Sequence, residues 1–221
     1  GLTGVQPVIF SKLSNKTLYN LSLYANSGIY SMNKILLKYL KKNKNPEAII
    51  LYISYNSTEA WNKVSYEKSI VVFKYGNLKD IVNYIFNYPQ SISIIINRSF
   101  RATARYIIFG KKKHLSYKKK LNNKLTEELG YYNNNPNTTL DCKKKISINK
   151  KKLEELKRFK NYMSNNYNKF YVYIAPFPKC LKIPSEIKKK FKDIADNKLY
   201  TIDDTYFKDL NHLNPNGAKL N

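Results

Sequence analysis

Apolar residues along this chain follow two spacings, one typical of strands and one typical of helices. Nearly continuous apolar runs at residues 48–53 and 170–175 indicate strands buried on both faces. Residues 17–23 alternate and are rich in β-forming types, and residues 199–202 form a further short run. The pattern therefore predicts strands at these ranges, lying side by side in a mainly parallel sheet.

Between these runs, apolar residues recur at every third or fourth position, as in amphipathic helices. Pro7 and Pro184 are further helix-start signals, since proline fits the first helical positions. The expected helices cover residues 7–13, 29–42, 78–86, 92–109, 149–163 and 184–195. Strands that alternate with helices predict an α/β fold, a three-layer sandwich with right-handed crossovers. The length of 221 residues suits one domain over 1–221.

The middle of the chain is less informative. Residues 70–73 are interpreted as a short strand or a buried turn. The expected helix that follows carries Arg98, Arg101 and Arg105 at helical spacing beside apolar residues. Such a helix either lies on an anionic surface or packs on the domain with a solvated basic face, and the second interpretation is favoured. The basic, Asn-rich stretch around 111–148 is expected to be an exposed insertion or a substrate-side loop.

The composition is strongly basic, with 40 Lys+Arg against 15 Asp+Glu and a net charge of +25. Such an excess is typical of partners such as nucleic acid, anionic membranes or acidic polymers. Many Asn, Ile and Tyr accompany the lysines, a bias expected from an A/T-rich genome, so the charge carries reduced weight. No apolar run approaches the roughly 18 residues of a membrane span. Cys142 and Cys180 show no metal spacing, and the sequence leaves open whether they pair.

Candidate chemistry gathers near the end of the chain. Asp209 and His212 occupy a polar loop after the last expected strand, where open α/β sheets place their ligands. A carboxylate can accept from one ring nitrogen of a histidine, which leaves the other nitrogen free to act as a base. The alternative is a polar surface turn. The longer run through Gly217 and Ala218 favours the site.

That run, Asp-x-x-His-Leu-Asn-x-x-Gly-Ala at residues 209–218, resembles the last conserved block of the SGNH (GDSL-like) hydrolases. The similar branch contains the alginate O-acetylation and D-alanyl-lipoteichoic acid proteins, and residues 19–23, 49–56 and 170–178 also match its order of segments. The resemblance implies a flavodoxin-like SGNH fold with His212 as base and Asp209 as its orienting acid.

The same resemblance implies an oxyanion hole made by the backbone N–H of Ala25 and the side chain of Asn56. Ala25 stands where the family usually has Gly, and Asn56 is equally readable as a helix cap or turn residue. The family nucleophile, a Ser in a Gly-x-Ser segment, is expected at or just before Gly1, so the first strand is missing from this sequence. The sequence is therefore either incomplete or a degenerate relative, and Thr3 is interpreted as a turn residue. No metal or cofactor is implied.

The leading hypothesis is an SGNH-type esterase or O-acyltransferase that acts on an acyl ester of a carbohydrate or cell-envelope polymer. The resemblance implies an extracytoplasmic or envelope location, with an N-terminal anchor and a membrane-bound acyltransferase partner as options. One alternative is a catalytically dead, glycan-binding relative. Another is a basic, ribosomal-type nucleic-acid-binding protein, although the basic residues are spread along the chain and no RRM, KH or zinc signature is present.

Overall fold

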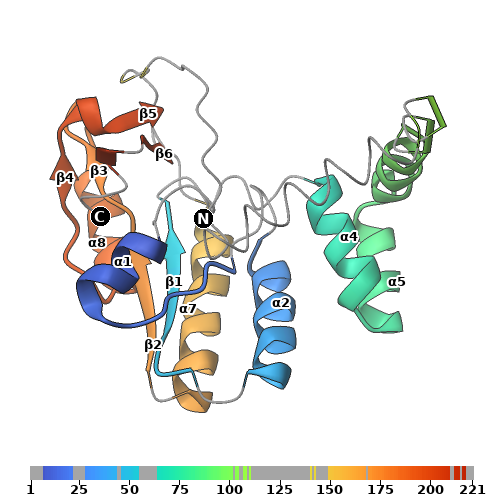
Figure 1. Cartoon of the computed structure of the whole chain (residues 1–221), viewed down its shortest axis with the longest axis horizontal. Helices are drawn as coiled ribbons and strands as arrows, with labels where there is room; N and C mark the ends of the chain where they lie inside the picture. The colour runs from blue at the N-terminus through green and yellow to red at the C-terminus, as the bar shows by residue number, and fades with distance from the viewer. Residues whose placement is uncertain are drawn as a thin grey trace.

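The fold is mixed α/β, with helices around small parallel sheets (Figure 1). The computed structural model describes residues 7–21, 28–43, 46–54, 64–101, 103–104, 107–108, 110, 140, 142, 149–167, 169–209, 212–214 and 216–217. Within these residues no helix is both long enough and apolar enough to cross a membrane. Most of the stretch expected to be an insertion lies outside the described residues.

The central sheet consists of β1 (Ile49–Ile53) and β2 (Phe170–Ile174), which run parallel and in register from their first to their last residues. Two further pairs of short strands follow. In one, β3 (Phe177–Pro178) runs parallel to β4 (Thr201–Ile202). In the other, β5 (Phe207–Asp209) runs antiparallel to β6 (His212–Leu213). The predicted strands at 48–53, 170–175 and 199–202 are thus confirmed in position.

The arrangement of these strands differs from the prediction. β4 pairs with β3 and not with β2, so the described strands do not form one continuous sheet. Residues 17–21 are not a strand, and the strand predicted there is wrong for these residues. The N–H of Leu18 donates to the Ser11 hydroxyl instead of to a neighbouring strand, and the Tyr19 ring lies against that of Tyr39 in α2. The α/β class holds, and the three-layer SGNH arrangement stays a proposal.

The core lies between the β1–β2 sheet and helix α7 (Lys150–Asn166). The helix begins where it was predicted to, and Asn149 caps it by accepting a hydrogen bond from the N–H of Lys152. The apolar face of α7 is buried against β2, where the ring of Phe159 meets that of Phe170 edge-on. The buried residues of this face are Leu153, Leu156, Phe159 and Met163. Beside α7 lies α2 (Gly28–Lys42), which confirms the helix predicted at 29–42 (Figure 1).

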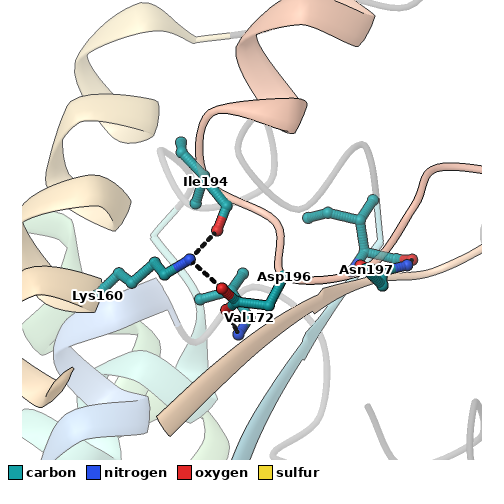
Figure 2. A network of polar contacts seen from close by, with 6 residues as sticks. Lys160, Val172, Ile194, Asp196 and Asn197 are labelled. Atoms are coloured by element: carbon teal, nitrogen blue, oxygen red, sulfur yellow. Dashed lines mark hydrogen bonds and ion pairs between the residues drawn. The ribbon is translucent and has the colours of Figure 1, made fainter.

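The outer edge of β2 is closed by side chains rather than by another strand (Figure 2). The Asp196 carboxylate accepts a hydrogen bond from the N–H of Val172, and the backbone N–H of Asp196 donates one to the Val172 carbonyl. Asn197 repeats this pattern on Ile174, with its amide oxygen accepting at 2.8 Å and its amide nitrogen donating at 3.0 Å. Lys160 of α7 binds the Asp196 carboxylate at 2.6 Å. The outward backbone groups of Val172 and Ile174 are therefore satisfied without a further strand, which explains why β4 does not pair there.

A helical unit extends from α2 away from the sheet (Figure 1). It begins with α4 (Tyr66–Tyr75), which replaces the short strand or turn predicted at 70–73; that prediction is wrong. Ser65 caps α4, and Val71 and Val72 are buried within this helix instead of in a strand. Next come α5 (Leu78–Asn87) and a helical segment from residue 90 to 101, in agreement with the helices predicted in this region.

Two short helices complete the described fold. They are α1 (Pro7–Ser14) and α8 (Ser185–Lys192), which match the helices predicted after Pro7 and Pro184. The α8 residue Phe191 is fully buried and packs against Phe177 of β3, so this helix joins the second strand pair to the core. A disulfide joins Cys142 to Cys180, which resolves the question that the sequence left open.

Candidate active site

The backbone brings the two predicted catalytic residues together in the β5–β6 ribbon. Asp209, at the end of β5, lies opposite His212, the first residue of β6, and Phe207 lies opposite Leu213. The register shifts between these two pairs, which indicates a β-bulge within β5. Phe207 and Leu213 are both buried, so they anchor the ribbon to the domain. In Figure 1 the ribbon lies at the end of the molecule to which β1 and β2 point their carboxyl ends.

Two residues of the C-terminal motif hold this ribbon in place. The Asn214 side chain donates to the Thr205 carbonyl at 2.6 Å and accepts from the N–H of Gly217 at 2.9 Å. Gly217 is required because a Cβ there would lie 2.2 Å from the Tyr206 carbonyl oxygen, far inside contact distance. The Asn-x-x-Gly spacing of the motif therefore shapes the loop around Asp209 and His212.

The approach to the ribbon is fixed by a pair of aspartates. Asp203 caps the 3₁₀ turn η1 (Asp204–Tyr206) by accepting from the N–H and the hydroxyl of Thr205, and these bonds hold the pKa of its carboxyl below the ordinary value. Asp204 accepts from the N–H of Cys180, the residue bonded to Cys142. The segment before β5 is thus tied to the loop after β3.

Sequence patterns missed a cluster of tyrosines on the sheet. Tyr52 of β1 and Tyr173 of β2 stack with ring centroids 5.5 Å apart, and the Tyr173 hydroxyl shares a 2.8 Å hydrogen bond with that of Tyr200. Burial, followed by the interaction with Tyr173, raises the pKa of Tyr200 above its ordinary value. The cluster supplies hydrogen-bonding hydroxyls beside the carboxyl ends of the strands. Its only sequence signal is a Tyr near the end of each of two neighbouring strands, which many half-buried strands share.

The remaining predicted site residues are not placed. Ala25 and Asn56, the expected oxyanion donors, lie outside the described residues, as does Gly1, near which the nucleophile is expected. β1 ends at Ile53, three residues before Asn56, so the described part ends just short of that loop. Their convergence with Asp209 and His212 stays a prediction.

The described residues also bring together Cys142, Cys180 and Asp204, whose possible ligand atoms lie within 4.8 Å of one another. Thiolate and carboxylate can bind metals together, but both sulfurs here belong to the disulfide. In this state the group offers a metal a single carboxylate, which already accepts from a backbone N–H. We assign it a structural role.

Comparison of the chain with protein-family models, with curated protein sequences and with solved structures found no match.

Proposed function

We propose that this protein is an SGNH-type esterase or O-acyltransferase that acts on an acyl ester of a carbohydrate or cell-envelope polymer. The observation that carries the proposal is the position of Asp209 opposite His212 in a braced ribbon. Directly opposed residues of an antiparallel pair have Cβ atoms about 4.5–5.5 Å apart, which is close enough for a carboxylate to orient an imidazole. The resemblance of residues 209–218 to an SGNH block adds support.

In this proposal each residue has a defined role. His212 takes the proton of a serine nucleophile and later gives it to the leaving group, and Asp209 fixes the tautomer and stabilises the imidazolium. The Ala25 N–H and the Asn56 side chain stabilise the negative charge of the tetrahedral intermediate. The serine is the one that the resemblance expects at or just before Gly1. No metal or cofactor takes part in these steps.

One observation supports an extracytoplasmic or envelope setting, and another supports the kind of substrate. The Cys142–Cys180 disulfide is a bond that persists in oxidising compartments. The net charge of +25 favours an anionic polymer as substrate. An acyltransferase in this setting needs an acyl donor, and a membrane-bound acyltransferase partner would supply it.

The test is an acetyl-ester assay on the natural full-length protein and its variants. We expect His212→Ala to lower kcat/KM about a thousandfold or more, because the base is used in both acylation and deacylation. Asp209→Asn should cost a similar or smaller factor through loss of orientation. The matched control is His114→Ala, which removes the other histidine of the chain and should leave the rate unchanged.

Three outcomes would contradict the proposal. Equal losses in the two histidine variants would show that His212 has no special role. A full-length protein that lacks the upstream serine and neither hydrolyses nor transfers acyl groups, yet binds glycans, would be a dead relative. Tight, sequence-specific binding of RNA without esterase activity would favour the alternative of a ribosomal-type nucleic-acid-binding protein.

A further inference from the structure

Helix α5 exposes a stripe of large apolar side chains. Leu78, Val82 and Phe86 recur at four-residue intervals, so they lie on one side of the helix. They are 78%, 41% and 82% exposed, respectively. Scattered exposed apolar residues are ordinary, but a row of them along a helix marks an interaction surface.

The next helical segment repeats this arrangement. Ile92, Ile96 and Phe100 also recur at four-residue intervals, and they are 41%, 62% and 73% exposed. Ile107, further along in helical conformation, is 74% exposed. We call the side chains of Leu78, Val82, Phe86, Ile92, Ile96, Phe100 and Ile107 the apolar stripe.

The stripe is not the side of these helices that faces the domain, because a different side of each helix is buried against the rest of the protein. In α5 that side carries Tyr84, which is buried and hydrogen-bonded through its hydroxyl to Ser69 of α4. In the next segment it carries Ser91, which is fully buried. The domain thus covers one side of each helix and leaves the apolar stripe open.

The helical unit that carries the stripe also carries basic residues. Lys74, Lys79 and Arg101 are exposed, and Arg98 stacks over the ring of Tyr66. Between residues 64 and 110 the acidic residues are Glu67 and Asp80, and the Asp80 carboxylate pairs with Lys34 at 3.1 Å. Residues 64–101 therefore carry more basic than acidic side chains.

We propose that α5 and the helical segment from residue 90 to 101 bind the surface of an anionic lipid bilayer, with the apolar stripe inserted at the boundary between head groups and acyl chains. Helices that are too short to span a bilayer but are apolar on one side and basic elsewhere lie in its interface. The net positive charge of the chain favours a lipid surface over a second copy of the chain as the partner of the stripe. A second copy of this chain would bring another net charge of +25 to the same surface and would be repelled, whereas anionic head groups would be attracted.

The experiment is co-sedimentation of the full-length protein with vesicles of phosphatidylcholine alone or mixed with phosphatidylglycerol. We expect binding to the mixed vesicles that weakens at high salt, and much weaker binding to the neutral ones. Phe86→Ser and Phe100→Ser should each lower the partition coefficient about tenfold, because each removes a buried aromatic ring from the bound state. Lys79→Gln should lower it about fivefold for the mixed vesicles alone.

The matched control is Leu13→Ser. Leu13 is 81% exposed on α1, away from the apolar stripe, so its loss should leave partitioning unchanged. A direct readout comes from Phe100→Trp combined with Trp61→Phe, which leaves one tryptophan, on the stripe. Its fluorescence should shift to shorter wavelength on the mixed vesicles and be quenched by brominated acyl chains.

The proposal is overturned if the stripe variants bind vesicles as tightly as Leu13→Ser does, since the lysines alone would then explain the attraction. It is also overturned if the tryptophan at position 100 stays unquenched on bound protein. Dimerisation that Phe86→Ser abolishes, without vesicle binding, would assign the stripe to a second copy of the chain instead.

Discussion

The body of the molecule, formed by β1, β2 and α7, differs from the helical unit of α4, α5 and residues 90–101 in what its apolar faces meet. In the body, one face of α7, from Leu153 to Met163, is buried, and the open edge of β2 is closed by Asp196 and Asn197. In the helical unit the periodicity is equally clear, yet Phe86 and Phe100 remain exposed. Amphipathic spacing therefore predicts where a helix forms, and the available partner decides whether its apolar face is buried.

The largest expected effect tests this difference directly. Leu156→Ala in α7 should lower the free energy of unfolding by about 2–5 kcal/mol, because it opens a cavity at a fully buried position. Phe86→Ala in α5 removes a larger side chain but should change stability by less than about 0.5 kcal/mol, since that ring is already in water. Urea unfolding measures both. A large loss in Phe86→Ala would mean that a part of this chain covers the stripe in solution.

A smaller effect is expected at the edge of β2. Asp196→Ala leaves the N–H of Val172 without its acceptor and should cost about 1–2 kcal/mol, a value lowered by the partial exposure of the side chain. Asp196→Asn keeps an acceptor and should cost less, because it loses chiefly the pairing with Lys160. Thermal unfolding compares the two variants. Equal losses would assign the effect to the ion pair rather than to closure of the edge.

Disrupting the contacts of Asn214 and Gly217 that hold the C-terminal ribbon should cost as much stability as Asp196→Ala or less. It should have a larger effect on the proposed activity. Gly217→Ala forces a Cβ against the Tyr206 carbonyl, so the loop must move, at a cost of about 1–2 kcal/mol. Because Asn214 binds the same turn, we expect the acetyl-ester rate to fall even where the protein remains folded. An unchanged rate in Gly217→Ala would separate the ribbon from the chemistry.

The sequence predicts the body well, for a physical reason. Continuous apolar runs such as 170–174 and the regular spacing from Leu153 to Met163 leave one plausible packing. The strand predicted at 17–23 fails over residues 17–21 because alternation alone does not supply a neighbouring strand. The error at 70–73 has a related cause: periodicity alone cannot tell whether a short continuous apolar run forms a strand or part of a buried helix.

Only part of the candidate site could be predicted from the sequence. Asp209 and His212 are close along the chain, so a tight ribbon was enough to place them opposite one another. The tyrosine cluster joins residues from distant segments, and only the register of β1 on β2 brings Tyr52 onto Tyr173. The same limit applies to the disulfide, since Cys142 and Cys180 are 38 positions apart.

The smallest expected effect concerns Lys68, which lies where the helical unit meets the body. The residue is 8% exposed, and its ammonium lies 4.9 Å from the centre of the Tyr88 ring and 5.8 Å from that of Tyr84. Burial, together with Lys152 of α7, lowers its pKa below the ordinary 10.5, although Glu155 acts in the opposite direction. A buried ammonium therefore costs stability at neutral pH.

The sign of the pH dependence follows from proton binding. Between the lowered pKa of Lys68 in the folded state and 10.5 in the unfolded chain, the unfolded chain binds more protons, so the free energy of unfolding rises with pH. Below both values the slope vanishes and the cost of burial is present in full. We expect Lys68→Met to flatten this rise relative to the parent protein at alkaline pH up to about 9.5, before the tyrosines titrate. Lys74→Met, on the exposed side of the same helix, controls for the loss of one positive charge. Parallel curves for the parent and Lys68→Met would mean that the ammonium is hydrated in solution, and that the helical unit contacts the body more loosely than α7 contacts β2.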